Sequence, residues 1–442
     1  MFRSKKSILF SSVAVLALTT LQANAGGFAL REQSAYGQGS SFAGIAAGGA
    51  LSSMFWNPAA MTQIPGKGFE IGASGILPKV SQSGTASVPL PGLGYTGGVD
   101  NSGVAALVPS SYVSWQFNDR LWVGMGINAP SGLAVSFPQL WAGSIYAQST
   151  EMKTYNFNPT VAYKINDWIS VGLGVQAQYM KVSYGNVAVA FPSANLTIDG
   201  NGWGYGWTAG VTLTPLPKTQ IGVGYRSAIN QDLGGSLYIP PGALAGGTPG
   251  SLKATLNLPD MVTVGLRQGI GDRFTLLGGF EWTNWSRIGT TNVYQPNGSP
   301  LLGPGGAAVK FPFEYRDGYL YSIGGEYIVQ PGLMLRSGIA FESSPITDQV
   351  RTPRIPDNDR TWYSVGASYK PPQLRGLSFD LAYSYVQVKS TPLNVSTAAG
   401  NPWAGSSTYV GDASSHLSIL SFAATYRWDD AAPAPRHQRI TK

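Results

Sequence analysis

The sequence predicts an all-β protein, a 14-stranded antiparallel transmembrane β-barrel with an N-terminal hatch (plug) inside its lumen. Three observations predict this fold. Apolar and polar residues alternate at period two along fourteen runs between residues 69 and 428. Short and long gaps alternate strictly between these runs. Charged residues make up only 12% of the chain, whereas a soluble domain has about 25%, so we expect much of the surface to face something other than water.

Residues 1–25 predict a secretory signal peptide. The start is basic, an apolar run extends from Ile8 to Leu18, and the small residues Ala23 and Ala25 precede the expected cleavage site. No later run reaches the roughly 18 consecutive apolar residues that a spanning helix requires. The chain has no cysteine and only two histidines, so we expect neither metal nor cofactor.

Residues 26–68, which precede the first run, are the candidate hatch. They are rich in Gly, Ala and Ser and end in the apolar stretch "MFWNPAAMT", Met54 to Thr62. Such large side chains need cover. Eight strands make a barrel that its own side chains fill, and 16 to 18 leave an open channel. Fourteen strands therefore leave a lumen that residues 26–68 would occupy. A disordered arm is the alternative, but such arms are poor in Phe, Trp and Met.

Residues 69–428 form the predicted barrel wall. Each run has about 10 residues or more, enough for a tilted strand to cross a bilayer, and closure leaves no unpaired edge in lipid. Six gaps are tight turns such as "NDR" at 118–120 and "QPG" at 330–332, and seven are long Gly/Pro-rich loops. A soluble sandwich gives no reason for this sorting. The short turns and both chain ends are therefore expected on the periplasmic side.

The polar face of the runs is expected to line the lumen and to carry buried charges, which must be paired or solvated. Two interpretations remain open: an ion-pair network that holds the hatch, or a cation that contacts an anionic head group. The residues do not show which Arg or Lys would do the latter. The expected lumenal charges are Lys164, Arg226, Arg267, Arg273, Glu281, Glu326, Arg336, Glu342 and Asp380.

The end of the third run, "NAPSG" from Asn128 to Gly132, is unusual for a strand. Pro130 has no amide hydrogen and Gly132 has no side chain, so pairing with a neighbouring strand should fail there. One interpretation is a kink that leaves a gap in the wall. The other is that these residues begin an extracellular loop.

Other motifs allow rival functions. His416 and Ser418 share one face of the last run, as in a barrel phospholipase, but no third group or oxyanion site is evident. An open general porin would need a lumen without a plug. The basic, Pro/Ala-rich residues 429–442 follow Trp428 and are expected to hang in the periplasm as a tail of unassigned role.

Several segments together resemble the FadL/TodX family of outer-membrane transporters for long-chain fatty acids and other hydrophobic compounds. They are "GGFALREQSAYGQGSSFAG" after the cleavage site, "NPAAM", "NAPSGLAVSF", "LPDMVTVGLR" and "TPRIPDNDRTWYSVGASY". The resemblance implies a monomeric barrel in the outer membrane of a Gram-negative bacterium, not an enzyme. It implies passive uptake through an outer groove, an interior apolar pocket and lateral release into the bilayer.

The resemblance also implies partners and site residues. Fatty acids are the favoured substrates, and aromatic or alkane hydrocarbons are the alternative; outer-membrane lipid and lipopolysaccharide are further partners. Nucleic acid is not an expected partner, because the sequence has no basic stripe with interleaved aromatic residues. The positions that match the family are Phe28 and Leu30 for substrate binding, Asn57, Pro58 and Ala59 for the hatch motif, and Asn128, Pro130 and Gly132 for the lateral-opening kink.

Overall fold

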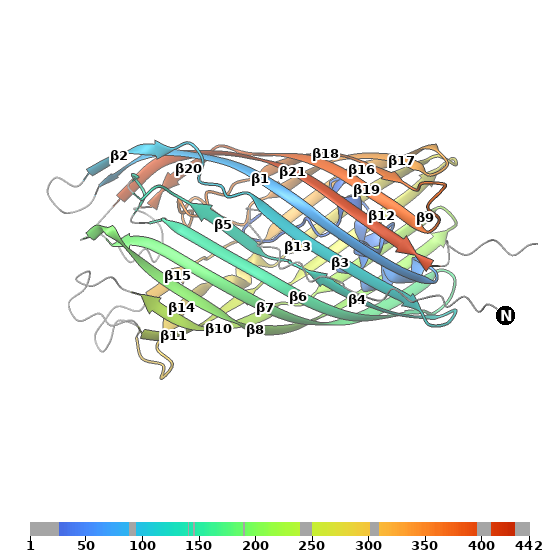
Figure 1. Cartoon of the computed structure of the whole chain (residues 1–442), viewed down its shortest axis with the longest axis horizontal. Helices are drawn as coiled ribbons and strands as arrows, with labels where there is room; N and C mark the ends of the chain where they lie inside the picture. The colour runs from blue at the N-terminus through green and yellow to red at the C-terminus, as the bar shows by residue number, and fades with distance from the viewer. Residues whose placement is uncertain are drawn as a thin grey trace, which may run out of the picture.

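The protein is described by a computed structural model that covers residues 26–87, 94–139, 141–144, 146–188, 191–238, 250–300, 309–395 and 408–428. The expected signal peptide (residues 1–25) and the expected tail (429–442) lie outside the described residues. The chain forms a long closed barrel that surrounds a small N-terminal hatch (Figure 1). The predicted fold, a 14-stranded antiparallel barrel, is confirmed.

Fourteen wall strands build the barrel from 21 strand segments. Seven wall strands are single segments: β1 (Lys67–Ser87), β6 (Ser149–Lys164), β7 (Ile169–Ala188), β8 (Phe191–Leu216), β17 (Leu333–Ser343), β18 (Arg360–Tyr369) and β21 (Thr408–Arg427). The others are formed by two segments each: β2 (Gly94–Val99) with β3 (Ala106–Gln116), β4 (Leu121–Asn128) with β5 (Gly132–Ser136), β9 (Thr219–Arg226) with β10 (Ile229–Tyr238), β11 (Gly250–Leu258) with β12 (Met261–Ile270), β13 (Phe274–Thr283) with β14 (Thr290–Tyr294), β15 (Val309–Pro312) with β16 (Gly318–Gln330), and β19 (Leu377–Val388) with β20 (Thr391–Asn394). Neighbouring strands pair antiparallel, and the pairing of β1 with β21 closes the ring.

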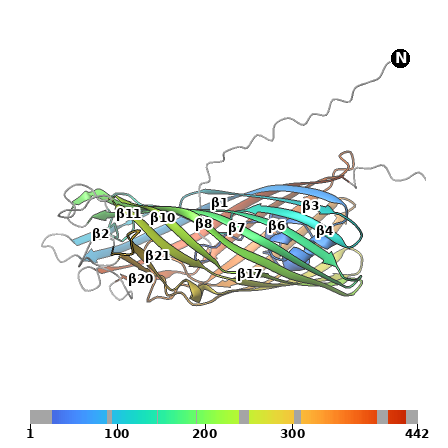
Figure 2. The ribbon, with the colours of Figure 1, turned by 90° about the horizontal axis from the view of Figure 1, so that it is seen from below.

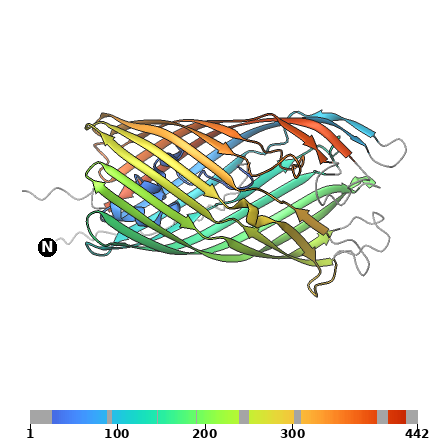
Figure 3. The same cartoon turned by 180° about the vertical axis from the view of Figure 1, so that it is seen from behind.

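The tight turns lie at the rim where β1 begins and β21 ends, and the hatch sits inside this end of the barrel (Figure 3). The view from below shows the same arrangement, with the wall strands tilted against the long axis (Figure 2).

Two of the charges that were expected in the lumen, Lys164 and Arg273, lie at these tight turns instead. Lys164 pairs with the fully exposed Asp167 at 2.8 Å in one turn, and Arg273 is exposed in another. Both predictions were wrong because each residue is the last before, or the first after, a turn, where the chain leaves the lumen.

The wall alternates between an apolar outer face and a polar lumenal face, as the period-two pattern predicts. On β6, for example, Tyr155 and Phe157 are exposed on the outside, while Asn156 and Asn158 are buried inside. On β13, Phe274 and Leu276 face out and Glu281 faces in. The exposed apolar residues are therefore those that a bilayer would cover.

The hatch consists of short helices: α1 (Ala35–Gln38), η1 (Ile45–Ala47), η2 (Leu51–Phe55) and η3 (Pro58–Gln63). A fourth 3-10 helix, η4 (Trp285–Ile288), lies after β13. None of the helices in the described part of the chain is long and apolar enough to cross a membrane. Met54, Phe55 and Trp56, from the stretch that needed cover, are at most 5% exposed. They pack with wall residues such as Tyr112 and Trp122 in one apolar cluster.

Glycines in the wall strands let the hatch lie directly against the wall backbone. A Cβ atom at Gly224 would lie 1.7 Å from the Trp56 carbonyl oxygen, and one at Gly210 would lie 2.0 Å from Asn57 Oδ1. Neither position could therefore carry a side chain while the hatch stays in place. This close approach explains part of the high glycine content, 57 residues.

Candidate functional site

The third wall strand is interrupted at residues 129–131, between β4 and β5, and the hatch N-terminus pairs with the interruption. Leu30 N donates to Pro130 O (2.9 Å), Gly132 N donates to Phe28 O (2.9 Å), and Ala29 forms an antiparallel bridge with Ser131. The chain resumes as a strand at Gly132, so these residues are a break within a strand and not the start of a loop. We call residues 129–131 the strand break.

The seam between the second and third wall strands loses its pairing at the same place. The register of β3 with β4 ends at the Ser111–Ile127 pair, and the next described bridge on this seam joins Gly103 to Val135. Between these points, the hatch residues and not β3 pair with the strand break. Pro130 explains part of this, because it cannot donate a hydrogen bond to a neighbour.

Gln33 connects the hatch to the strand break through side-chain hydrogen bonds. Its Nε2 donates to Leu30 O (3.1 Å) and Ala129 O (2.8 Å), and its Oε1 accepts from Ala129 N at 3.2 Å. Gln33 is completely buried. The hatch N-terminus and the strand break are thus held together by backbone and amide hydrogen bonds, without an ion pair between them among the described residues.

An apolar cavity of about 80 Å³ lies beside Phe28, on the outer side of the hatch. We call it the Phe28 cavity. The Phe28 ring is fully buried and meets Trp285 of η4 edge-on, with 4.7 Å between ring centroids. The wall supplies mainly aliphatic and aromatic side chains, among them Leu133, Met152, Val182, Leu233, Leu256, Val293, Phe311 and Phe313. The cavity can accommodate an oily group and offers it few hydrogen-bond partners.

A cation adjoins the Phe28 cavity. The guanidinium of Arg354, in the loop before β18, lies 3.5 Å from the ring centroid of Tyr184, which lines the cavity. It also donates to Thr150, another lining residue, and to the carbonyl oxygens of Ser149 and Tyr146. Burial lowers the pKa of Arg354, but the side chain stays charged near neutral pH.

A second cavity of about 80 Å³ lies on the turn side of the hatch N-terminus. We call it the Arg226 cavity. Its lining includes Ala29 and Leu30 of the hatch, Pro130 and Ser131 of the strand break, and Arg226 of the wall. Hatch residues 28–30 thus contribute to both cavities and adjoin the strand break. Phe28 lines the first cavity and Leu30 the second, so the two predicted binding residues are placed in different spaces.

Buried ion pairs connect the hatch to the wall. Arg31 pairs with Glu281 (2.8 Å) and Glu342 (3.3 Å). Deeper in, Arg267 pairs with Glu326 at 2.6 Å, and the hatch hydroxyl of Tyr36 also donates to Glu326. Arg336 pairs with Asp380 at 3.2 Å. Seven of the nine charges expected in the lumen therefore face it, and six of these seven form ion pairs there; Arg226 is the exception.

Glu32 is a buried hatch residue whose carboxyl group accepts no hydrogen bond from the described residues. It is 1% exposed, and neither carboxyl oxygen has a hydrogen-bond partner in the described part of the chain. Burial raises the pKa of Glu32 to about 7. The docked hatch thus favours the protonated form of this side chain.

The three residues of the NPA motif hold the centre of the hatch. Asn57 Nδ2 donates to Ala46 O (2.7 Å) within the hatch and to Val211 O (3.0 Å) and Thr212 Oγ1 (3.1 Å) of β8. Its Oδ1 accepts from Ala59 N at 3.0 Å and so caps η3, where Pro58 takes the first helical position. All three residues are buried.

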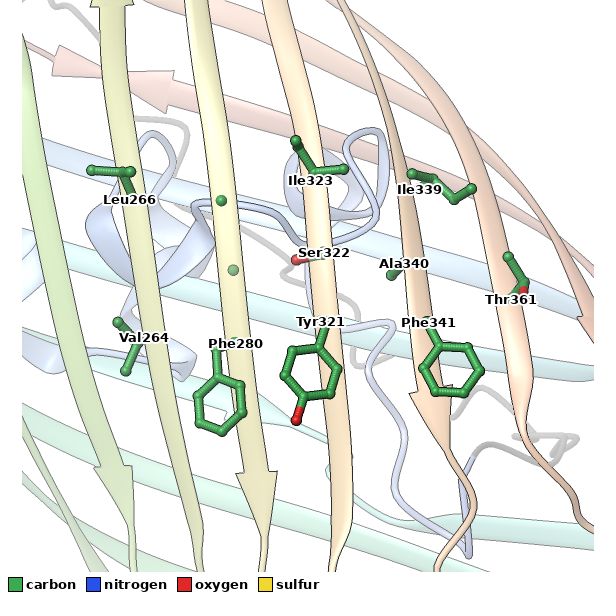
Figure 4. Close-up of a pocket in the computed structure, with 12 residues that line it drawn as sticks. Val264, Leu266, Phe280, Tyr321, Ser322, Ile323, Ile339, Ala340, Phe341 and Thr361 are labelled. Atoms are coloured by element: carbon green, nitrogen blue, oxygen red, sulfur yellow. The ribbon is translucent and has the colours of Figure 1, made fainter.

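A hollow of about 590 Å³ lies on the outer face of the wall. Figure 4 shows it over β12, β13, β16 and β17, with Phe280, Tyr321 and Phe341 in one row. Gly278 stands opposite Leu266 and Ile323 and leaves the space that a side chain would fill. The exposed Ile323 and Ile339 show that this hollow faces the membrane, so it is separate from the two interior cavities.

The rival catalytic pair does not form a triad. His416 lies partly exposed on the outer wall, with its ring centroid 5.6 Å from that of Tyr385 and the two rings tilted by 36°. Ser418 Oγ contacts Tyr383 OH at 3.2 Å. In the described residues no acid orients His416, and no cluster of three or more His, Cys, Asp or Glu could hold a metal.

Sequence reasoning missed several residues of the site. Gln33, Trp285 and Arg354 lie in the hatch and in loops, where no periodicity marks the direction of a side chain. Gln33 could have been suspected, since it is an amide three residues from Leu30 in a segment expected inside an apolar lumen. Arg354 and Trp285 carried no such signal.

A closed barrel with an apolar exterior, an interior plug and buried apolar cavities defines a class: outer-membrane transport proteins for hydrophobic compounds. The sequence matches the family described as outer membrane protein transport protein (OMPP1/FadL/TodX) over residues 16–428. The chain belongs to this family, and it is therefore a non-enzymatic transporter of the outer membrane of Gram-negative bacteria.

Individual relatives agree with this assignment. The chain is 29% identical to a long-chain fatty acid transport protein of Salmonella typhi over 425 residues, which cover 88% of this chain and 93% of that protein. A FadL homologue from Pseudomonas aeruginosa superposes with a TM-score of 0.81 at 25% identity, covering 91% of this chain and all of that chain. The toluene transporter TodX of Pseudomonas putida shares the fold, with a TM-score of 0.63 at 15% identity over 90% of this chain and 98% of that chain.

Proposed function

We propose that the protein takes up long-chain fatty acids passively and releases them sideways into the outer membrane through the strand break. The observation that carries this proposal is the position of hatch residues 28–30, which line both interior cavities and pair with residues 130–132. Displacement of these few residues would join the two cavities and free the strand break in one movement.

Lateral release suits an oily cargo. Exposing each methylene group to periplasmic water would cost about 0.8 kcal/mol, and passage into the bilayer avoids this cost. Hatch residues 34–63 would stay docked on the wall and block a direct path to the periplasm. Phe28 and Leu30 would contact the cargo, and Asn128, Pro130 and Gly132 would shape the exit. We further propose that the protein acts as a monomer.

The choice of a fatty acid rests on Arg354, because a cation beside an otherwise apolar cavity would attract a carboxylate head group. The names of the curated relatives agree with this choice. An aromatic or alkane hydrocarbon is the second candidate, and the almost wholly apolar lining of the Phe28 cavity favours it. Uptake of labelled oleate and labelled toluene by cells that carry the protein separates the two: oleate uptake without toluene uptake is the expected result.

A reversible cross-link tests the movement. Ala29 and Ser131 form a non-hydrogen-bonded antiparallel pair, in which Cα atoms lie about 4.5 Å apart, within the range of a disulfide. Since the chain has no native cysteine, the double variant A29C/S131C can be locked and unlocked cleanly. We expect oxidation to stop uptake and reduction to restore it, with both single variants insensitive. Full uptake by the oxidised protein would refute release through this route.

A further inference from the structure

Arg226 is a buried lumenal arginine without an acidic partner among the described residues. It ends β9, is 6% exposed, and makes contacts only with neutral groups. Nη1 donates to Phe55 O of the hatch (3.1 Å), Nη2 donates to Asn156 Oδ1 (3.4 Å) and to Gln176 Oε1, and the guanidinium lies 4.2 Å from the Phe55 ring centroid. These bonds use three of the five N–H groups of a guanidinium.

Arg336 is a second wall arginine that contacts the hatch, and it does so while an acidic residue neutralises its charge. It makes the same two kinds of contact as Arg226: Nη1 donates to Tyr36 O of the hatch (3.3 Å), and the guanidinium lies 3.9 Å from the Tyr36 ring centroid. Arg336, however, is neutralised by Asp380. A buried charge is normally paired because desolvation is costly, so the charge of Arg226 needs a further explanation.

Asn128 supplies a second polar group on the same side of the lumen. It is 3% exposed, and neither its amide nitrogen nor its amide oxygen has a hydrogen-bond partner in the described part of the chain. Asn128 stands directly across from Asn156 in the β4–β6 register, and Asn156 in turn contacts Arg226. Asn128, whose amide has no hydrogen bond, and Arg226, whose charge has no acid, are thus related through Asn156, and both are costly to bury unless a ligand completes them.

The Arg226 cavity provides room for the apolar part of such a ligand. Ile229, Leu258 and Met261 line it together with Leu30 and Pro130. The acid in its lining, Glu281, is already paired with Arg31. Arg31 also lines the cavity, but Glu281 and Glu342 already neutralise it. The cavity thus combines one cation that no acid neutralises with a lining of apolar and polar side chains, next to the strand break.

We infer that Arg226 and Asn128 form a carboxylate-binding site that holds the head group of a fatty acid between the Phe28 cavity and the strand break. The inference rests on the proposed uptake of fatty acids. Displacement of residues 28–30 would let the head group reach the free N–H groups of Arg226 while its chain enters the break. A neutral alcohol would gain less from this site, because its hydroxyl group carries no charge and cannot accept from two guanidinium N–H groups as a carboxylate does, so the site would discriminate between acids and alcohols.

The test compares uptake of a long-chain fatty acid with uptake of the alcohol of the same chain length. R226Q keeps a donor for Phe55 O but loses the charge, and we expect the acid-to-alcohol uptake ratio to fall about 10- to 100-fold, the scale of one or two charge-assisted hydrogen bonds. R226K should restore part of the ratio. The matched control is R336Q/D380N, which weakens an equivalent hatch contact without leaving a charge unpaired, and it should affect both cargoes equally.

A second variant keeps the test decisive if R226Q fails to assemble. N128L removes no hydrogen bond of the described structure, so it should fold, and it should lower the acid-to-alcohol ratio about threefold or more, on the scale of one neutral hydrogen bond. An unchanged ratio in R226Q, or in N128L where only that variant assembles, overturns the site and makes Arg226 a hatch anchor. Failure of the wild type to take up the acid, with the alcohol still entering, removes the proposed substrate and the site together.

Discussion

The two parts of the hatch are held in different ways. Residues 34–63 dock on the wall through hydrogen bonds to strand backbone, through aromatic side chains in the large apolar cluster and through glycines that admit the hatch backbone. Residues 27–33 contact an apolar cavity, a short stretch of broken strand and an ion-pair cluster. The first part resembles a protein core, and the second resembles a gate whose bonds could be exchanged for those of a ligand.

The polar contacts of the two parts show the same difference. Asn57 is hydrogen-bonded on every side within the docked region, whereas Glu32, Asn128 and the Nε of Arg31 have unpaired polar atoms near the hatch N-terminus. Unpaired buried polar atoms lower the stability of a region. This difference fits the proposal that residues 34–63 seal the barrel while residues 27–33 move.

Asn57→Ala should have the largest effect on conductance, because it removes hydrogen bonds that hold residues 34–63 of the hatch on the wall. The change leaves two carbonyl oxygens, one hydroxyl and one amide without their partner, at a cost of about 4 kcal/mol or more in total. We expect the hatch to undock and the single-channel conductance in planar bilayers to rise severalfold. Asn118→Ala, in an exposed turn, is the control and should not conduct. A closed Asn57→Ala barrel would show that the docking lies elsewhere.

Phe28→Ala should have a smaller effect, confined to the gate. Loss of a buried phenylalanine costs about 3 to 5 kcal/mol in a well-packed core, and here it also enlarges the cavity beside Trp285. We expect weaker binding of fluorescent fatty acid, by about tenfold or more, with the low basal conductance unchanged. Conductance as high as that of Asn57→Ala would mean that the two parts of the hatch do not differ.

Glu32 is expected to make the docking of the gate depend on pH. Its pKa is raised to about 7, so the docked gate is most stable well below the usual carboxyl pKa of about 4.5 and loses this stability as the pH rises through 7. We expect uptake of a long-chain alcohol, whose own charge does not change with pH, to increase in the wild type between pH 5 and pH 8, by the equivalent of about 2 kcal/mol in gate stability. Glu32→Gln should remove this dependence and keep uptake at pH 8 as low as at pH 5. A wild-type uptake that decreases over this range would contradict the assignment.

His416→Ala should have the smallest effect, since the side chain lies on the outer wall and touches neither part of the hatch. Surface changes of this kind alter stability by less than about 0.5 kcal/mol. Uptake and thermal stability should match the wild type within error. A clear loss of uptake would require a role for the outer wall that the two-part hatch does not provide.

Sequence reasoning predicted the wall better than the site. Period-two alternation along runs such as Tyr155–Ile165 placed the outer and lumenal faces correctly, because a strand shows only two faces and the bilayer covers one. It misplaced Lys164 and Arg273, since alternation does not show where a strand leaves the lumen. The position of Arg354 depends on long-range folding of a loop, and the partners of Arg226 come from three separate segments. No local pattern encodes such contacts.

The glycines opposite the hatch have a consequence for evolution. Because Gly210 and Gly224 admit the hatch backbone at Trp56 and Asn57, a substitution of either glycine would require a compensating change in the hatch. A hatch transplanted from a relative would fit this wall only if its backbone approached the same two glycines. We therefore expect hatch and wall to change together in evolution, as one inherited unit.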